Sequence, residues 1–84
     1  MYQIVYKKKA IKSLEKMPAA IAAKFKDAFY AIADGNKANL DIKPLEGLNG
    51  YRLRINSYRA MYELDNGRLI VTVFNIGSRG DIYK

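Results

Sequence analysis

The sequence contains neither cysteine nor histidine among its 84 residues. Without cysteine the chain forms no disulfide and no thiolate metal site, which fits a reducing compartment. Without histidine it lacks the commonest metal ligand and the one side chain whose ordinary pKa lies near neutrality. Any catalysis by this chain must therefore use tyrosine, lysine, arginine, aspartate or glutamate.

Long apolar runs and cofactor motifs are also missing. No stretch of about 18 apolar residues is present, the length needed to span a membrane. Met1 leads directly into an alternating, strand-like pattern, so we expect no secretory signal. No glycine-rich nucleotide loop, metal-ligand spacing or catalytic triad occurs, so neither a cofactor nor a metal is expected. The length is that of one domain, spanning residues 1–84.

Positive charge is in excess, with 15 lysines and arginines against 8 acidic residues and a net charge of +7. This balance favours a polyanionic or acidic partner, the alternative being a surface charged only for solubility. The two cations are segregated: all five arginines follow residue 50, whereas nine of the ten lysines precede residue 44. Arginine offers a fixed fork of donors that suits phosphate, which directs attention to the C-terminal half.

Hydrophobic periodicity predicts the element order β-α-α-β-β-β. The helices should form an N-terminal αα-hairpin packed on a small, mostly antiparallel sheet, which is an α+β domain. The nearly continuous apolar run near the C-terminus predicts a central strand buried on both faces. The predicted elements are strands over residues 2–6, 51–55, 58–64 and 68–76, helices over about residues 8–17 and 19–34, and a loop over residues 35–49.

The second half of the chain carries the main functional candidates. Alternation along the first strand of the predicted hairpin puts Arg52 and Arg54 on one face, with Leu53 on the other. Arg59 on the partner strand is expected close to both. Like charges placed opposite one another destabilise a sheet, so an anionic ligand would offset the cost of this cluster. The alternative is a charged strand that resists edge pairing.

Other candidates are weaker. Arg79 lies between Gly77 and Gly80, where a backbone can approach a ligand closely. Tyr83 has a ring that can stack on a base, or it can form a short last strand. Glu63 and Asp81 are the nearest acids in the sequence, and structural ion pairs are the favoured interpretation of both. The Lys7–Lys9 run is interpreted as an exposed helix face in preference to a phosphate contact.

Several segments together resemble a known group of proteins. They are LEGLNGYRLR at residues 45–54, YRAMY at 58–62, and GSR at 77–79 followed by Tyr83. With the order of the elements, these segments resemble the RelE/ParE superfamily of toxins from bacterial type II toxin–antitoxin pairs, and most of all its RelE branch. The resemblance covers essentially the whole chain.

The resemblance implies a ribosome-dependent endoribonuclease that cuts mRNA in the ribosomal A site and so inhibits translation. Such enzymes use a metal-free attack of the ribose 2′-OH on the adjacent phosphate. Carried over by position, the site would comprise Arg52, Arg54, Arg59, Arg79 and Tyr83. Many relatives have lysine at one or both of positions 52 and 54, and arginine cannot be deprotonated. The general base is therefore open between Tyr83, Glu63 and a ribosomal group.

The resemblance also implies partners and alternatives. The partners would be mRNA on the 70S ribosome and a cognate antitoxin, which would join the toxin in a hetero-oligomer in the bacterial cytoplasm without a membrane. One alternative is a ParE-like inhibitor of DNA gyrase. The other is a catalytically inert member of the same fold that binds only its antitoxin.

Overall fold

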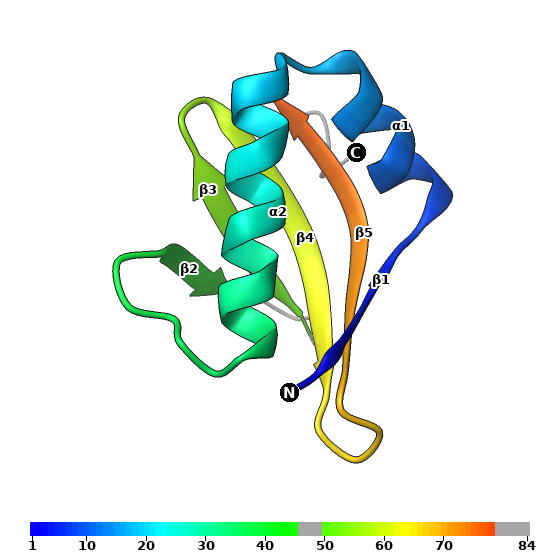
Figure 1. The fold of residues 1–84 in the computed structure, drawn as a ribbon, viewed down its shortest axis with the longest axis vertical. Helices are drawn as coiled ribbons and strands as arrows, with labels where there is room; N and C mark the ends of the chain where they lie inside the picture. The colour runs from blue at the N-terminus through cyan, green and yellow to red at the C-terminus, as the bar shows by residue number, and fades with distance from the viewer. Residues whose placement is uncertain (46–49, 79–84) are drawn as a thin grey trace.

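The computed structural model describes residues 1–45 and 50–78 of the chain. In Figure 1, the long helix α2 crosses one face of a twisted sheet. The sheet has five strands in the order β1-β5-β4-β3-β2, and only β1 and β5 pair in parallel. The predicted α+β class, with a helical hairpin on a mostly antiparallel sheet, is confirmed. The elements are β1 (Gln3–Tyr6), α1 (Lys8–Lys16), α2 (Ala19–Ala33), β2 (Asp41–Pro44), β3 (Tyr51–Ile55), β4 (Tyr58–Asp65) and β5 (Ile70–Ser78).

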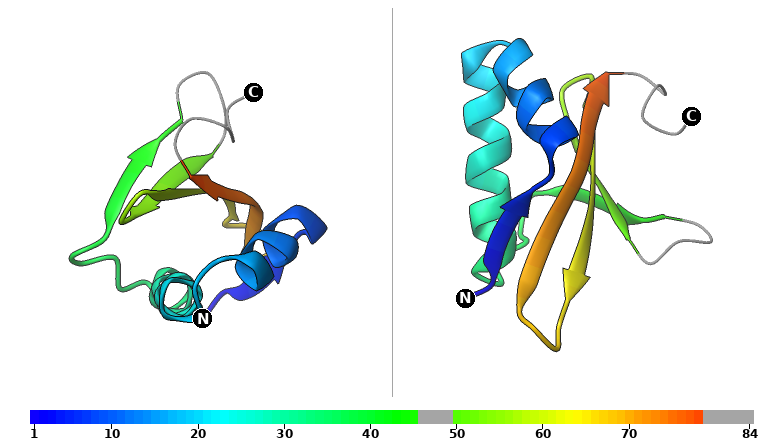
Figure 2. Two further views of the ribbon diagram at one scale, coloured as in Figure 1. Left: turned by 90° about the horizontal axis from the view of Figure 1, so that it is seen from above. Right: turned by 90° about the vertical axis from the view of Figure 1, so that its right-hand side faces the viewer.

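The core lies between α2 and the sheet. Both helices lie on the same side of the sheet in Figure 2. Phe25, Phe29 and Ile32 recur at helical spacing on α2, and all three are buried. The Phe29 ring meets the Tyr62 ring of β4 edge to face, with centroids 5.4 Å apart. The face of the sheet that packs on α2 is therefore the core face, and the opposite face is available for a functional site.

Strand β5 is an interior strand between β1 and β4, but the prediction that it is buried on both faces is wrong. Val71, Val73 and Ile76 are buried toward the helices, whereas Phe74 is 36% exposed. The register shows an irregularity: Met61 pairs with Asn75 and Tyr62 pairs with Val73, so Phe74 is an extra residue at a β-bulge. A bulge resets the alternation of faces. Val73 and Ile76 therefore both lie on the core face although they are three residues apart.

Strand β2 corrects the prediction of a loop over residues 35–49. Asp41–Pro44 forms an edge strand antiparallel to β3. The segment is only four residues long, and Ile42 is its single aliphatic residue, so its sequence carries little local strand signal. Pro44 ends the strand, a position where an edge strand tolerates a missing N–H donor. Pairing with β3 makes this segment a strand. Strand β3 lies too far along the chain for the local sequence around residues 41–44 to reveal the pairing.

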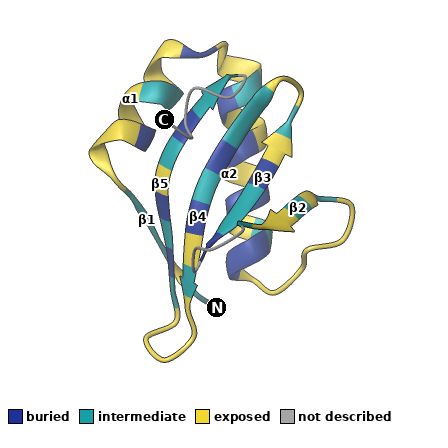
Figure 3. Cartoon of the chain, turned by 180° about the vertical axis from the view of Figure 1, so that it is seen from behind, coloured by how far each residue is buried: buried dark blue, intermediate teal, exposed yellow. Residues whose placement is uncertain are grey.

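The sheet face turned away from α2 is shown in Figure 3. Strands β3, β4 and β5 run side by side across this view, and exposed or half-buried residues alternate with buried ones along them. We call this the open face of the sheet. Neither described helix has the length and apolar composition that crossing a bilayer requires.

Candidate functional site

Three arginines gather on the open face through the β3–β4 hairpin. Arg54 and Arg59 are direct cross-strand partners, and Arg52 lies two residues before Arg54 on the same strand. Leu53 and Ala60, which alternate with them, are completely buried on the opposite face. The hairpin therefore places Arg52, Arg54 and Arg59 on one face of a rigid backbone. We call these three residues the arginine cluster.

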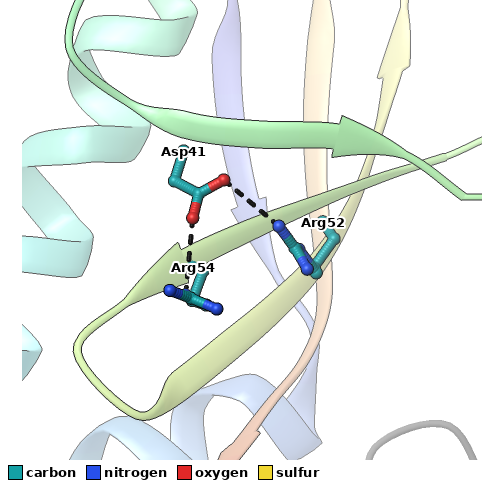
Figure 4. A network of polar contacts seen from close by, with 3 residues as sticks. All are labelled: Asp41, Arg52 and Arg54. Atoms are coloured by element: carbon teal, nitrogen blue, oxygen red, sulfur yellow. Dashed lines mark hydrogen bonds and ion pairs between the residues drawn. The ribbon is translucent and has the colours of Figure 1, made fainter.

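Strand β2 adds a carboxylate that sequence analysis did not single out. Asp41 is the register partner of Arg54. Its Oδ1 accepts a hydrogen bond from Arg52 Nη2 at 3.1 Å, and its Oδ2 lies 3.4 Å from Arg54 Nε. Figure 4 shows the carboxylate between the two guanidinium groups, with one oxygen directed at each. One aspartate thus bridges two of the three arginines and offsets part of their repulsion.

The acids that sequence proximity suggested have different positions. Glu63 lies four residues along β4 from Arg59, and its register partner is Thr72 on β5. Asp81 lies outside the described residues. The signal that identifies Asp41 is the β2–β3 register, which no local pattern in the sequence reveals.

The two bridged arginines differ in exposure. The Arg52 side chain is only 17% exposed, and its buried Nε has no hydrogen-bond partner within residues 1–45 and 50–78. The Arg54 side chain is 52% exposed and the Asp41 side chain 45%. Arg52 is thus a largely immobilised cation, whereas Arg54 can reorient toward an incoming anion. An immobilised donor is the kind that stabilises developing negative charge without reorganisation.

A lysine-lined groove lies next to the arginine cluster. It is an open groove of about 530 Å³, lined by Lys7, Lys8, Lys9, Met61, Phe74 and Asn75. Met61 is the cross-strand partner of Arg52, and Asn75 is the partner of Met61, so one row of residues joins cluster and groove. The three lysines are exposed, as predicted, and they line the groove together with Phe74. Cations beside an exposed ring are typical of surfaces that bind single-stranded nucleic acid.

Two of the five predicted site residues cannot be placed. Arg79 and Tyr83 lie outside the described residues, and so does the short last strand suggested for the segment around Tyr83. Strand β5 ends at Ser78, opposite Tyr58, and Gly77 is the register partner of Arg59. The catalytic roles of all five residues stay predictions.

The buried tyrosine of β4 belongs to the core. Burial, with a smaller contribution from neighbouring Tyr51, raises the pKa of Tyr62 to about 12. Its hydroxyl is buried and has no hydrogen-bond partner in the described part of the chain. The ring stacks on Tyr51 with centroids 5.5 Å apart. Tyr62 therefore stays protonated under ordinary conditions and serves packing, not proton transfer.

Comparison with known proteins identifies the family. The family model for the ParE toxin of type II toxin–antitoxin systems matches residues 4–83. None of the curated proteins matches the sequence. The match to the family model confirms the superfamily resemblance that the sequence predicts.

Solved structures of toxins have the same fold. The RelB–RelE antitoxin–toxin complex of Methanococcus jannaschii matches with a TM-score of 0.78 and 24% identity over 94% of each chain. The RelE–RelB complex of Pyrococcus horikoshii matches with a TM-score of 0.77 and 25% identity over 94% of this chain and 96% of that one. The isolated Escherichia coli RelE toxin matches with a TM-score of 0.76 and 18% identity over 99% of this chain and 92% of that one.

Proposed function

This chain belongs to the ParE toxin family of type II toxin–antitoxin systems, and from its arginine cluster we propose that it is a ribosome-dependent endoribonuclease of the RelE type. It would cut mRNA in the ribosomal A site and so inhibit translation. The observation that carries the proposal is the arginine cluster, with Arg54 and Arg59 paired across β3 and β4 on the open face. The solved RelE structures support the fold, and the reaction rests on the arginines.

The reaction we propose needs no metal. The ribose 2′-OH attacks the adjacent phosphate, which leaves a cyclic phosphate and a free 5′-OH. Negative charge builds on the phosphorus-bound oxygens in the transition state, and fixed guanidinium donors stabilise that charge. We assign Arg59 and Arg79 to the phosphate, Arg52 and Arg54 to the region of the nucleophile and leaving group, and Tyr83 to stacking on the nucleotide.

The lysine-lined groove supports an RNA substrate. A strand that places one phosphate on the arginine cluster can continue across Met61 into the groove. There the exposed ring of Phe74 offers a stacking surface and the lysines offer cations for the next phosphate. Stacking and phosphate contacts of this kind bind single strands without requiring a particular base.

A second candidate is inhibition of DNA gyrase by binding alone. The match to the ParE family model favours it, because resemblance to the ParE branch implies binding to gyrase without nuclease chemistry. The same scaffold then needs no catalytic arginines, and the cluster would serve antitoxin binding. An inert, antitoxin-binding member of the fold is the remaining alternative.

We also propose a cognate antitoxin as partner, in a hetero-oligomer in the bacterial cytoplasm. Several of the similar solved structures are toxin–antitoxin complexes. The net charge of +7 favours an acidic or amphipathic antitoxin segment that covers the arginine cluster.

A cell-free bacterial translation reaction tests the nuclease. Purified protein is added with and without ribosomes, and mRNA 5′ ends are mapped. We expect ribosome-dependent cuts at A-site codons, and we expect Arg59→Ala to lower the cutting rate about 10²- to 10³-fold, as loss of a fixed transition-state donor does. The matched control is Arg68→Ala, which removes the same charge from a side chain that is 81% exposed in the turn after β4.

The outcomes separate the candidates. Equal cutting by wild type and Arg59→Ala would remove the arginine cluster from the mechanism. Intact mRNA together with gyrase-linked DNA breaks in a parallel assay would move the protein to the ParE mechanism. Neither activity would leave the inert antitoxin-binding alternative.

A further inference from the structure

We propose that Asp41 is the general base that takes the proton from the ribose 2′-OH. The proposal rests on the proposed nuclease function and assigns a residue to the general base, the role that the proposed function leaves open. The chain has no histidine, and arginine cannot act as a base at physiological pH. Asp41 is a carboxylate held inside the arginine cluster, in contact with two of its members.

The position of Asp41 is set by backbone pairing. Strand β2 is antiparallel to β3, and Asp41 lies directly opposite Arg54, which in turn lies opposite Arg59. The three residues form one row across β2, β3 and β4. Side chains in such a row on one face are close enough to act on one small ligand. A phosphate held by Arg54 and Arg59 would therefore lie beside the Asp41 carboxylate.

The two oxygens of Asp41 are held unequally. Oδ1 accepts the 3.1 Å hydrogen bond from Arg52, which is largely buried and immobilised. Oδ2 lies at the longer distance of 3.4 Å from Arg54, whose side chain is half exposed. When Arg54 turns toward a phosphate, Oδ2 is released while Oδ1 stays anchored. Arg52 then acts as the positioning residue for the base, and Oδ2 is the atom that receives the proton.

The proton and electron pairs balance without a metal or a cofactor. The 2′-oxygen forms a bond to phosphorus as its proton passes to Asp41 Oδ2. The bond from phosphorus to the 5′-oxygen breaks, and the 5′-oxygen takes a proton from water. The hydroxide so formed removes the proton from Asp41, which restores the carboxylate. The products are a 2′,3′-cyclic phosphate and a 5′-OH, as the proposed function requires.

Two other candidate bases within the described residues fit less well. The Tyr62 hydroxyl is buried on the core side of the sheet, with its pKa raised to about 12. Glu63 is four residues along β4 from Arg59 and opposite Thr72, so it lies outside the row that holds Asp41. The competing role for Asp41 itself is that of a counter-ion that only relieves repulsion between Arg52 and Arg54.

Single-turnover cutting of mRNA on programmed ribosomes, with small carboxylates of different basicity added back to Asp41→Gly, separates these roles. Asp41→Asn keeps the size of the side chain and removes the base. We expect its cutting rate to fall about 10²- to 10⁴-fold, with ribosome binding unchanged. Asp41→Glu should retain part of the rate, and the rescue of Asp41→Gly should rise with the basicity of the added carboxylate. The matched control is Asp65→Asn, which removes a carboxylate 3.9 Å from Arg68 and should behave as wild type.

Three results would overturn the role. The first is an Asp41→Asn rate within a few-fold of wild type. The second is a rescue of Asp41→Gly that is the same for every added carboxylate, because a counter-ion acts through its charge and not through its basicity. The third is restoration of the Asp41→Asn rate by an mRNA with sulfur in place of the 5′-oxygen, which would mark Asp41 as the acid for the leaving group. Absence of cutting by the wild type would refute the nuclease itself, and the base with it.

Discussion

The two faces of the sheet use the same strands for opposite purposes. On the face toward α2, Leu53, Ala60 and Val71 are completely buried, and the described core contains no buried charged residue. On the open face, Arg54 and Arg59 oppose one another, one residue away from Leu53 and Ala60 respectively. A strand carries both faces because successive side chains point in opposite directions. Stability and proposed chemistry are thus separated across the thickness of one sheet.

The separation implies that substitutions act on stability or on activity according to the face they touch. A core substitution removes packing that the whole domain shares. A substitution among exposed or half-exposed charges removes little stability, because exposed ion pairs contribute about 0–1 kcal/mol. The following predictions, from the largest expected effect to the smallest, test how complete this separation is.

The largest effect is expected for Phe29→Ala. Phe29 is completely buried and contacts the rings of Tyr6, Phe25 and Tyr62. Its loss should lower the free energy of unfolding by about 3–5 kcal/mol, measured by urea denaturation. Tyr30→Ala on the same helix is the matched control, because Tyr30 is 60% exposed and its loss should have little effect. Equal effects of the two substitutions would contradict the assignment of the core face.

An intermediate effect is expected at high pH through Tyr62. Its pKa is about 12 in the folded protein, against an ordinary value of 10.0, so the folded state holds the proton more tightly. The resulting stability is present in full below pH 10 and is lost as the pH rises through 10 and past 12. Once Tyr62 is deprotonated in the folded state as well, the free energy of unfolding has fallen by about 2–3 kcal/mol.

Tyr62→Phe tests this pH dependence, because it removes the titrating hydroxyl and keeps the ring. At neutral pH it should be about as stable as wild type, because the hydroxyl has no hydrogen-bond partner among the described residues. Between pH 10 and pH 12 it should lose less stability than wild type in thermal unfolding experiments. An identical decline in both proteins would mean that Tyr62 does not titrate as a buried group.

The smallest effect is expected for Lys8→Gln on the rim of the lysine-lined groove. If Lys8 contacts one phosphate, the slope of log affinity against log salt for single-stranded RNA should become shallower by about 0.7. Fluorescence anisotropy with a labelled oligonucleotide measures this slope. Lys24→Gln, on the exposed side of α2, is the matched control and should leave the slope unchanged. A slope change that is equal in both variants would indicate a response to net charge, not to the groove.

Much of the fold follows from local pattern. The stripe of Phe25, Phe29 and Ile32 predicts a helix packed on a sheet, and the structure buries all three. The hairpin around Asn56 was predicted from alternation and a two-residue turn, and Asn56 adopts the left-handed conformation with φ 54°. The placement of Arg52 and Arg54 on one face needs only the two-residue period of a strand.

The features that the sequence did not predict share one cause. Each depends on pairing between strands that are apart in the sequence. The apolar run in β5 suggested burial on both faces, but the bulge at Phe74 depends on how β5 pairs with β4. The segment around Ile42 forms a strand only because it pairs with β3. For the same reason Asp41 passed unnoticed, since nothing near it in the sequence relates it to arginines more than ten residues away.

The amino-acid sequence by itself determined the two helices, the β3–β4 hairpin and the face that carries the arginines, because these depend on residues close together in the chain. Only the tertiary structure decided that β1 runs parallel to β5, that residues 41–44 form the sheet edge, and that Asp41 bridges Arg52 and Arg54. Those features depend on hydrogen bonding between distant segments. The physical reason is that strand periodicity specifies a face for each side chain, whereas the register between strands specifies its neighbours.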